Sequence, residues 1–119
     1  MALLLREDDV RRVLTMPEAI AALEVAFRDW GQGAAQNVPR QRIVLREQGG
    51  VLHVLPAAVP ALDALGFKAY TTYAGGVRFA VNLYRASTGE LLAIIEADWL
   101  GRMRTGAASG LATKLLANP

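Results

Sequence analysis

The sequence contains no cysteine, and this excludes disulfide bonds and thiol chemistry. It fits a reducing compartment. The single histidine, His53, has no cysteine or second histidine at metal-ligand spacing, so neither a metal site nor a histidine-based triad is expected. We therefore expect His53 to have a structural role in the apolar stretch around it.

Long apolar runs and a strong charge of one sign are also missing. No apolar run approaches the ~20 residues that a membrane-spanning helix needs. The opening residues, MALLLREDD, lack the basic region and the longer apolar run of a signal peptide. The formal net charge is +2, and the 13 basic residues are scattered rather than clustered. We expect a cytoplasmic protein that binds neither nucleic acid nor a membrane.

The chain does have enough apolar residues for a core. Its 119 residues are 53% hydrophobic, which predicts a single small domain over residues 1–119. Predicted helices near both ends flank several strand-like runs, and this order predicts an α+β fold. We expect a mixed or mostly antiparallel sheet with helices packed on one face.

The clearest element is a helix that begins after Thr15. Thr15 and Glu18 form a capping box with Pro17 in the first turn. Behind them, apolar residues recur at spacings of three and four and make one helical face, and glycines at 31 and 33 end the helix. The residues of that face are Ile20, Leu23, Phe27 and Trp30.

The remaining elements are predicted from shorter signals. Asp8 or Asp9 is expected to cap a brief helix after a strand at 3–5, and Pro56 is expected to end a strand. Asp98 is expected to cap a last helix that stops at Asn118-Pro119. Residues 59–64 are expected to be a loop. The main strands are predicted at 40–45, 51–55, 67–73, 79–84 and 91–95.

Four cations form the first candidate site. Strand alternation puts Arg40 and Arg42 on one face, and Lys68 lies in an otherwise apolar strand, where an unpaired ammonium is costly to bury. Together with Arg104 they could hold a small carboxylate, which suits the planar fork of arginine. From composition alone we favour the simpler interpretation of solvated surface cations, or ion pairs with Glu47, Glu90 or Glu96.

Two further segments are weaker candidates. The small residues that follow Arg104, up to Ser109, predict close packing at a helix start, where free N–H groups could bind an anion. The loop at 75–78 contains Arg78 as a possible ligand contact, but glycine-rich loops are usually turns, and no GxGxxG fingerprint occurs. Glu96 and Asp98 are two residues apart near a helix start. They could form a catalytic carboxylate pair, but helix capping is the simpler interpretation of both residues.

Several motifs together resemble the ornithine cyclodeaminase/mu-crystallin family. They occur in the order and spacing of that family, and the resemblance covers essentially the whole chain. It implies that this chain corresponds to the N-terminal substrate-binding and dimerisation portion, without the nucleotide-binding Rossmann domain. The matching segments are Val38-Pro39-Arg40 with Arg42, Val51 to Pro56, Gly66-Phe67-Lys68, Thr88-Gly89-Glu90, and Glu96 to Leu116 with Arg104-Thr105-Gly106-Ala107-Ala108-Ser109 at its centre.

The resemblance also implies roles for individual residues. It favours a carboxylate site over the simpler interpretation of the four cations as solvated surface residues. It implies that Lys68, Arg104 and one of Arg40 and Arg42 hold the carboxylate of an amino-acid substrate; alignment through the Pro56 strand does not choose between the two arginines. It implies that Thr105 contacts an NAD or NADP cofactor. The family's catalytic aspartate belongs to the other domain, so no catalytic residue is expected here.

The family reaction implied is hydride transfer from the α-carbon of a small amino acid to NAD(P), or reduction of an imino acid in reverse. Members include cyclodeaminases, alanine dehydrogenases and ketimine reductases. We expect a homodimer and no NAD(P)-dependent turnover by this chain alone. The alternative is a non-catalytic dimerisation or ligand-binding module, which would not bind NAD(P).

Overall fold

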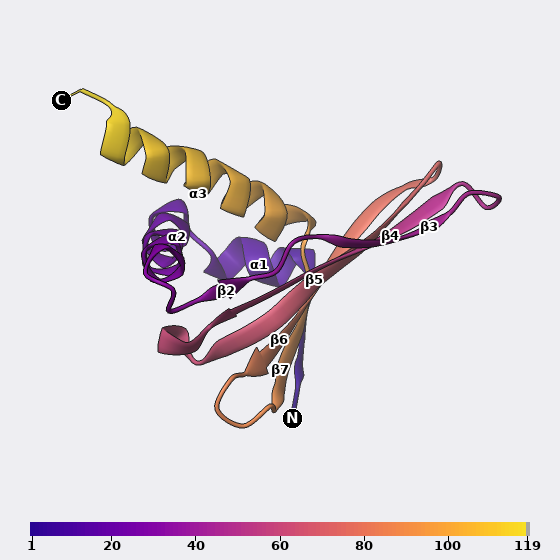
Figure 1. The fold of residues 1–119 in the computed structure, drawn as a ribbon, viewed down its shortest axis with the longest axis horizontal. Coiled ribbons are helices and arrows are strands. Elements are labelled where there is room, and N and C mark those ends of the chain that lie inside the picture. The colour runs from indigo at the N-terminus through magenta and orange to yellow at the C-terminus, as the bar shows by residue number, and fades with distance from the viewer. Residues whose placement is uncertain (119) are drawn as a thin grey trace.

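The computed structural model describes residues 1–118, which form a seven-stranded sheet with α-helices on one of its faces (Figure 1). This confirms the predicted α+β class and the placement of the helices. Pro119, half of the predicted helix stop, lies outside the described residues. The elements are β1 (Leu3–Leu5), α1 (Glu7–Val13), α2 (Met16–Gly31), β2 (Gln36–Asn37), β3 (Gln41–Leu45), β4 (Gly50–Val59), a 3₁₀ turn (Pro60–Leu62), β5 (Ala64–Tyr73), β6 (Gly76–Arg85), β7 (Leu91–Glu96) and α3 (Asp98–Leu116).

The sheet is mixed because one of its edge strands runs parallel to its neighbour. The strand order is β1-β7-β6-β5-β4-β2, and β3 also pairs with β4. β1 is parallel to β7, whereas the other pairs are antiparallel. The central strands β4, β5 and β6 are each ten residues long, longer than predicted. Much of the expected loop at 59–64 is therefore strand or 3₁₀ turn.

The prediction that Pro56 ends its strand is wrong. β4 continues to Val59, and Pro56 pairs with Phe67 of β5. In an antiparallel strand, the N–H and the carbonyl of one residue point to the same neighbour. The Pro56 carbonyl accepts from the Val38 N–H at 3.1 Å, so its missing N–H faces the break between β2 and β3. The proline interrupts no ladder bond with β5.

Helix α2 forms as predicted. The Glu18 N–H donates to Thr15 Oγ1 at 3.4 Å, and the Thr15 N–H donates to Glu18 Oε2 at 3.1 Å. This is the reciprocal capping box. α2 ends at Gly31, and Gly33 follows with a φ of 76°.

The glycines of α3 allow close contact with α2. A Cβ built at Gly110 would lie 3.0 Å from Ile20 Cδ1, and one at Gly106 would lie 3.2 Å from Met16 Cε. Ala107, between them, is fully buried. The small residues of this segment are therefore explained by helix–helix packing.

The start of α3 is capped from another element, which corrects the prediction for Asp98. The N-cap is Ala97, and Asp98 is the first helical residue. Both carboxylate oxygens of Glu7 in α1 accept N–H groups there, from Asp98 at 2.8 Å and from Trp99 at 2.9 Å. Glu96 Oε2 in turn accepts the Glu7 N–H at 3.0 Å. α1 and α3 are thus joined at their N-termini by two carboxylates.

The start of α1 also differs from its prediction, because neither Asp8 nor Asp9 is the N-cap. Arg6 holds that position, and Asp9 is the third helical residue. The carboxylate of Asp9 accepts the Arg6 N–H at 2.9 Å. Asp9 therefore closes the first turn from inside the helix.

We expect Glu7→Gln to lower the free energy of unfolding by about 1–2 kcal/mol, because one charged acceptor at the α3 N-terminus becomes a donor. Urea unfolding followed by circular dichroism measures this change. Asp8→Asn is the matched control, because Asp8 also lies in the first turn of α1 but caps nothing in α3. An equal loss in both variants would contradict the capping role.

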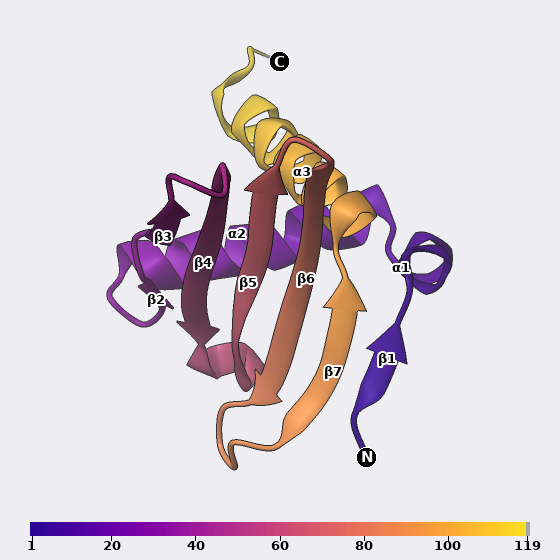
Figure 2. The same ribbon diagram turned by 90° about the vertical axis from the view of Figure 1, so that its right-hand side faces the viewer.

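The two faces of the sheet differ in how they are covered. The face toward the helices, called the helix face, carries Lys68 with Leu55 and Val81 on either side. In the part of the chain that the structure describes, no helix covers the opposite, open face, which is turned to the viewer in Figure 2. The open face is largely apolar, and its large apolar side chains include Leu4, Ile43, Leu45, Leu52, Val54, Leu65, Phe67, Tyr84 and Ile94.

The exposed surface is large for a chain of this size. It measures 8306 Å², whereas a compact monomer of 12.8 kDa exposes about 6,300 Å². Within residues 1–118, no large side chain is completely buried. The described residues therefore leave apolar surface uncovered on both sides of the sheet. In the same part of the chain, no helix is long and apolar enough to cross a membrane.

Candidate functional site

Three of the four predicted cations line one cavity on the helix face. It has a volume of about 410 Å³ and lies between the sheet and the first turns of α3. Lys68 comes from β5, Arg40 from the segment before β3, and Arg104 from α3. No carboxylate lines this cavity, and the described residues place no acidic side chain within ion-pair distance of these cations. Its other lining residues are Asn37, Leu55, Val81, Ala97, Leu100 and Gly101.

Lys68 is held by an aromatic row that crosses the sheet. Its Nζ lies 5.0 Å from the ring centroid of Phe79 and 5.5 Å from that of Tyr70. Tyr70 stacks on His53 at 4.3 Å, and Arg40 approaches the Tyr70 ring at 5.9 Å. These contacts fix the ammonium beside the cavity and stabilise its charge through the ring faces.

The electrostatics of the cavity favour an anion. Burial is the largest cause that lowers the pKa of Lys68, and the charges of Arg104 and Arg40 lower it further. A negatively charged ligand would favour the protonated ammonium and so oppose this lowering of the Lys68 pKa by burial and by the two arginines. Burial and the charges of Arg40 and Arg42 also lower the pKa of His53, which shares a 3.3 Å hydrogen bond with Thr72.

Arg42 does not line the cavity with the other three. It lies in β3 opposite His53, and it lines a smaller pocket, of about 250 Å³, with Gln41, Ile43, Leu52 and Val54. The strand begins only at Gln41, so Arg40 belongs to the irregular segment before it, and it lines the same cavity as Arg104 of α3. The geometry therefore favours Arg40 over Arg42 as the third member of the cluster.

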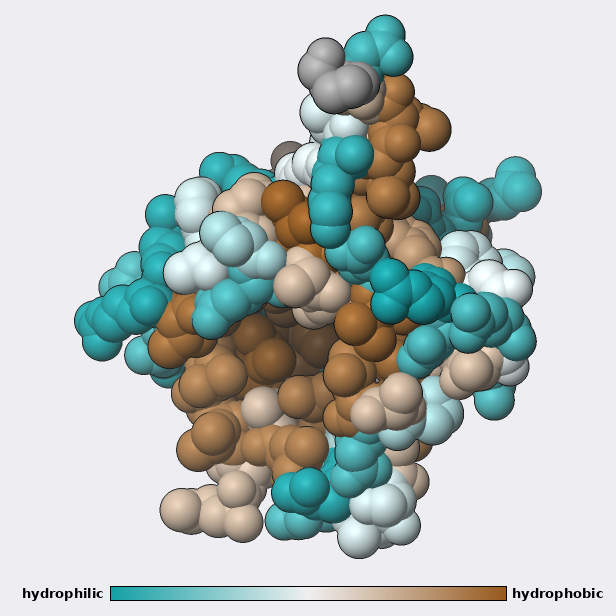
Figure 3. Space-filling model, turned by 90° about the vertical axis from the view of Figure 1, so that its left-hand side faces the viewer, coloured by the Kyte–Doolittle hydropathy of each residue, from teal (hydrophilic) through white to brown (hydrophobic). Residues whose placement is uncertain are grey.

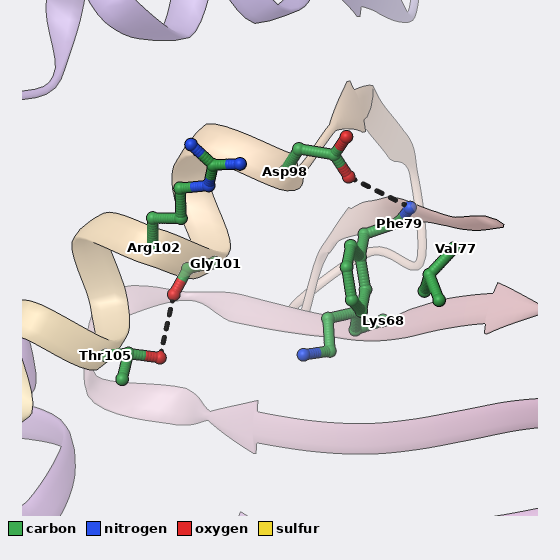
Figure 4. A pocket seen from close by; sticks show the side chains of 7 residues that line it. All are labelled: Lys68, Val77, Phe79, Asp98, Gly101, Arg102 and Thr105. Carbon is green, nitrogen blue, oxygen red and sulfur yellow. Dashed lines mark hydrogen bonds between the residues drawn. The ribbon is translucent and has the colours of Figure 1, made fainter. Parts of the chain in front are cut away.

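Thr105 lines a second cavity on the other side of Lys68. This cavity has a volume of about 540 Å³, and Figure 4 shows it between the start of α3 and the strands. The Thr105 hydroxyl donates to the Gly101 carbonyl at 2.9 Å, which leaves its oxygen lone pairs free to accept. Asp98 Oδ1 accepts the Phe79 N–H at 3.3 Å. Lys68, Val77 and Arg102 complete the lining.

Two weaker predictions are corrected. Residues 104–109 lie well inside α3, which begins at Asp98, so they are not a helix start with free N–H groups. Arg78 lies in β6 opposite Thr71, on the open face, and cannot replace a contact in the cavity. Glu96 does accept a hydrogen bond at a helix N-terminus, but at that of α1 and not at the adjacent start of α3 where capping was expected.

Sequence reasoning missed the aromatic row of His53, Tyr70 and Phe79. Each residue belongs to a different strand, and only the register brings them together: His53 opposes Tyr70, and Tyr70 opposes Phe79. An available signal was the alternation in β5, which puts Tyr70 on the face of Lys68. A register for β4 and β6 was needed to find the other two residues.

Comparison with known proteins identifies the family of this chain. The sequence model of the ornithine cyclodeaminase/mu-crystallin family matches residues 2–119. The chain belongs to this family. The resemblance inferred from the sequence is therefore confirmed for the whole described fold.

Individual relatives within the ornithine cyclodeaminase/mu-crystallin family cover nearly all of the chain. Alanine dehydrogenase of Archaeoglobus fulgidus is 33% identical over 97% of this chain. The structure of a probable ornithine cyclodeaminase from Bordetella pertussis is 34% identical over 100% of the chain, with a TM-score of 0.93. That of Thermococcus litoralis Δ1-pyrroline-2-carboxylate reductase, in complex with NADH and L-proline, is 32% identical over 98%, with a TM-score of 0.87.

The chain spans only 37% of the length of the first relative and 38% of the other two. The cationic cavity and the Thr105 cavity both fall within this shared portion. Relatives named as a dehydrogenase, a cyclodeaminase and a reductase therefore share the fold that positions both cavities.

Proposed function

We propose that this chain is the substrate-binding part of an NAD(P)-dependent oxidoreductase or cyclodeaminase that acts on small amino or imino acids. The observation that carries the proposal is the cavity lined by Arg40, Lys68 and Arg104 without a carboxylate. In it, the substrate carboxylate would accept charged hydrogen bonds from the guanidinium and ammonium groups. This chain would therefore bind the substrate and orient it for the reaction.

The second cavity supports the proposal through its position. Lys68 and Gly101 line both cavities, so a ligand at Thr105 would be adjacent to one at the cations. Adjacency is what hydride transfer between a substrate carbon and a nicotinamide requires. Thr105, Arg102 and the Phe79 ring would contact the cofactor, which itself supplies the hydride chemistry.

Titration of the purified chain with acetate and with L-proline tests the proposal. Two-dimensional ¹H–¹⁵N NMR should show saturable shifts at Lys68, Arg104 and their neighbours. Shifts spread over all surface cations, or none at all, would contradict a carboxylate site. Equal concentrations of chloride control for ionic strength.

The affinity for a carboxylate should fall at alkaline pH. The folded pKa of Lys68 lies below its ordinary value of 10.5, so the ammonium loses its proton at a lower pH than in an exposed lysine. A bound anion stabilises the protonated form, and binding is therefore full below that pKa and weakens as the pH rises through it. Affinities measured by NMR from pH 7 to 10.5 check this, and the Lys68→Met variant should lack the alkaline decrease.

A second candidate function is a non-catalytic dimerisation or ligand-binding module. It is favoured by the open face, whose apolar side chains no described element covers. Titration with NADH and NADPH separates the two functions. Saturable shifts around Thr105 support the oxidoreductase part, whereas carboxylate binding without nucleotide binding supports the module.

We also propose that two copies of the chain pair through their open faces. The surface exceeds that of a compact monomer by about 2,000 Å², more than the ~800 Å² that each partner contributes to a standard interface. Two sheets can pack face to face and bury such side chains between them. The helix faces, with their cavities, would then point outward.

A further inference from the structure

An apolar hollow continues from the cationic cavity along the helix face. It has a volume of about 270 Å³ and shares Leu55, Lys68 and Val81 with that cavity. Figure 3 shows a hollow lined by apolar, brown atoms on the side of the molecule that carries the helices. Besides these three, its lining consists of Ala57, Val59, Ala64, Gly66 and Leu83 on the helix face, and of Leu65 and Phe67, whose side chains the strand alternation places on the open face.

The hollow lies on the opposite side of Lys68 from the Thr105 cavity. Along β6, Phe79 lines the Thr105 cavity, Val81 lies opposite Lys68, and Leu83 lines the hollow. Every second residue of a strand lies on the same face, so these three side chains follow one another along β6. The Thr105 cavity, the cationic cavity and the hollow therefore follow one another in the same order. A ligand whose carboxylate lies at the cations therefore has the hollow on one side and the Thr105 cavity on the other.

Among residues 1–118, no acidic residue lines either the hollow or the cationic cavity. Asp98 is the acid that lines the Thr105 cavity, and one of its oxygens accepts the Phe79 N–H. An ammonium at the far end of a substrate would enter apolar surroundings with no partner, and the three cations would repel it.

We infer that the hollow receives the side chain of the substrate and selects an uncharged, apolar one, with Val81 and Leu83 as specificity-determining residues. The inference rests on the proposed carboxylate site and adds the substrate class. Amino or imino acids with an alkyl side chain or an apolar ring fit this arrangement, and diamino acids do not. The methylene groups of the side chain would contact Leu55, Val81 and Leu83.

L-Norleucine and L-ornithine test this inference because they are isosteric, with a terminal methyl in one and a terminal ammonium in the other. NMR titration of the full chain should give an affinity for norleucine roughly tenfold or more above that for ornithine. Leu83→Asp, which places a carboxylate in the hollow, should remove or invert this preference. Leu83→Asn is the matched control, because it adds polarity without charge, and it should not favour ornithine.

A measurement on the unchanged chain keeps the test independent of the folding of these variants. Norleucine should shift the methyl resonances of Leu83 and Val59, whereas acetate, which has no side chain, should leave them in place. Equal affinities for norleucine and ornithine, or identical behaviour of the Asp and Asn variants, would overturn the inference and leave the carboxylate site intact. Failure of acetate, norleucine and ornithine alike to bind would instead overturn the proposed function.

Discussion

Replacing Lys68 by methionine is expected to weaken carboxylate binding roughly 10- to 150-fold, which corresponds to about 1.5–3 kcal/mol for one charged hydrogen bond. Methionine retains an unbranched chain of similar length, so the contact with the Tyr70 and Phe79 rings is largely kept. Arg104→Met and Arg40→Met should have effects of the same order. NMR titration with acetate or L-proline measures all three variants.

The stability of the Lys68 variant separates a binding role from a structural one. Burial and the charges of Arg104 and Arg40 already oppose the ammonium in the free chain. Removing its charge should therefore leave the free energy of unfolding unchanged or slightly higher. A loss of stability with unchanged carboxylate affinity would show that Lys68 has a purely structural role.

Arg42→Met is the matched control for the arginines, because Arg42 is two residues from Arg40 but lines a different pocket. Its affinity for a carboxylate should stay within about twofold of the unchanged chain, because an exposed cation at this distance is screened by solvent and salt. A large effect of Arg42→Met with none of Arg40→Met would reverse the choice between them.

Local signals predicted the helices better than the strand ends. The α2 capping box lies within four consecutive residues, so its geometry follows from sequence alone. The cap of α3 comes from Glu7, which is 91 residues away from Asp98 in the chain. No local pattern contains that information, and Asp98 was therefore wrongly expected to cap the helix itself.

Strand predictions failed where the outcome depended on a neighbouring strand. Pro56 is compatible with β4 because its missing donor faces the break between β2 and β3. The candidate site shows the same limit: strand alternation put Arg40 and Arg42 on one face, but it could not show that Arg40 alone approaches Arg104. The family resemblance grouped the four cations into one expected site. The tertiary structure then showed that Arg42 lines a different pocket from Arg40.

A charge placed on the open face should abolish the pairing of two chains. Leu52 is the third residue of β4, lies on that face and is 37% exposed. Because Leu52 is partly open to solvent in the single chain, Leu52→Glu should cost the monomer little. In a face-to-face pair the carboxylate would be buried without a partner, at a cost of several kcal/mol. The association constant should therefore fall by about 100-fold or more, since 2.8 kcal/mol corresponds to that factor.

Sedimentation velocity at micromolar concentration measures this change. Leu116→Glu is the matched control, because Leu116 is 83% exposed at the end of α3 and lies away from the open face. This control should sediment like the unchanged chain, as a dimer, while Leu52→Glu sediments as a monomer. A stable monomer for the unchanged chain, or equal dissociation of both variants, would contradict pairing through the open face. Retained carboxylate binding by monomeric Leu52→Glu would further show that each helix face forms its cationic cavity within one chain.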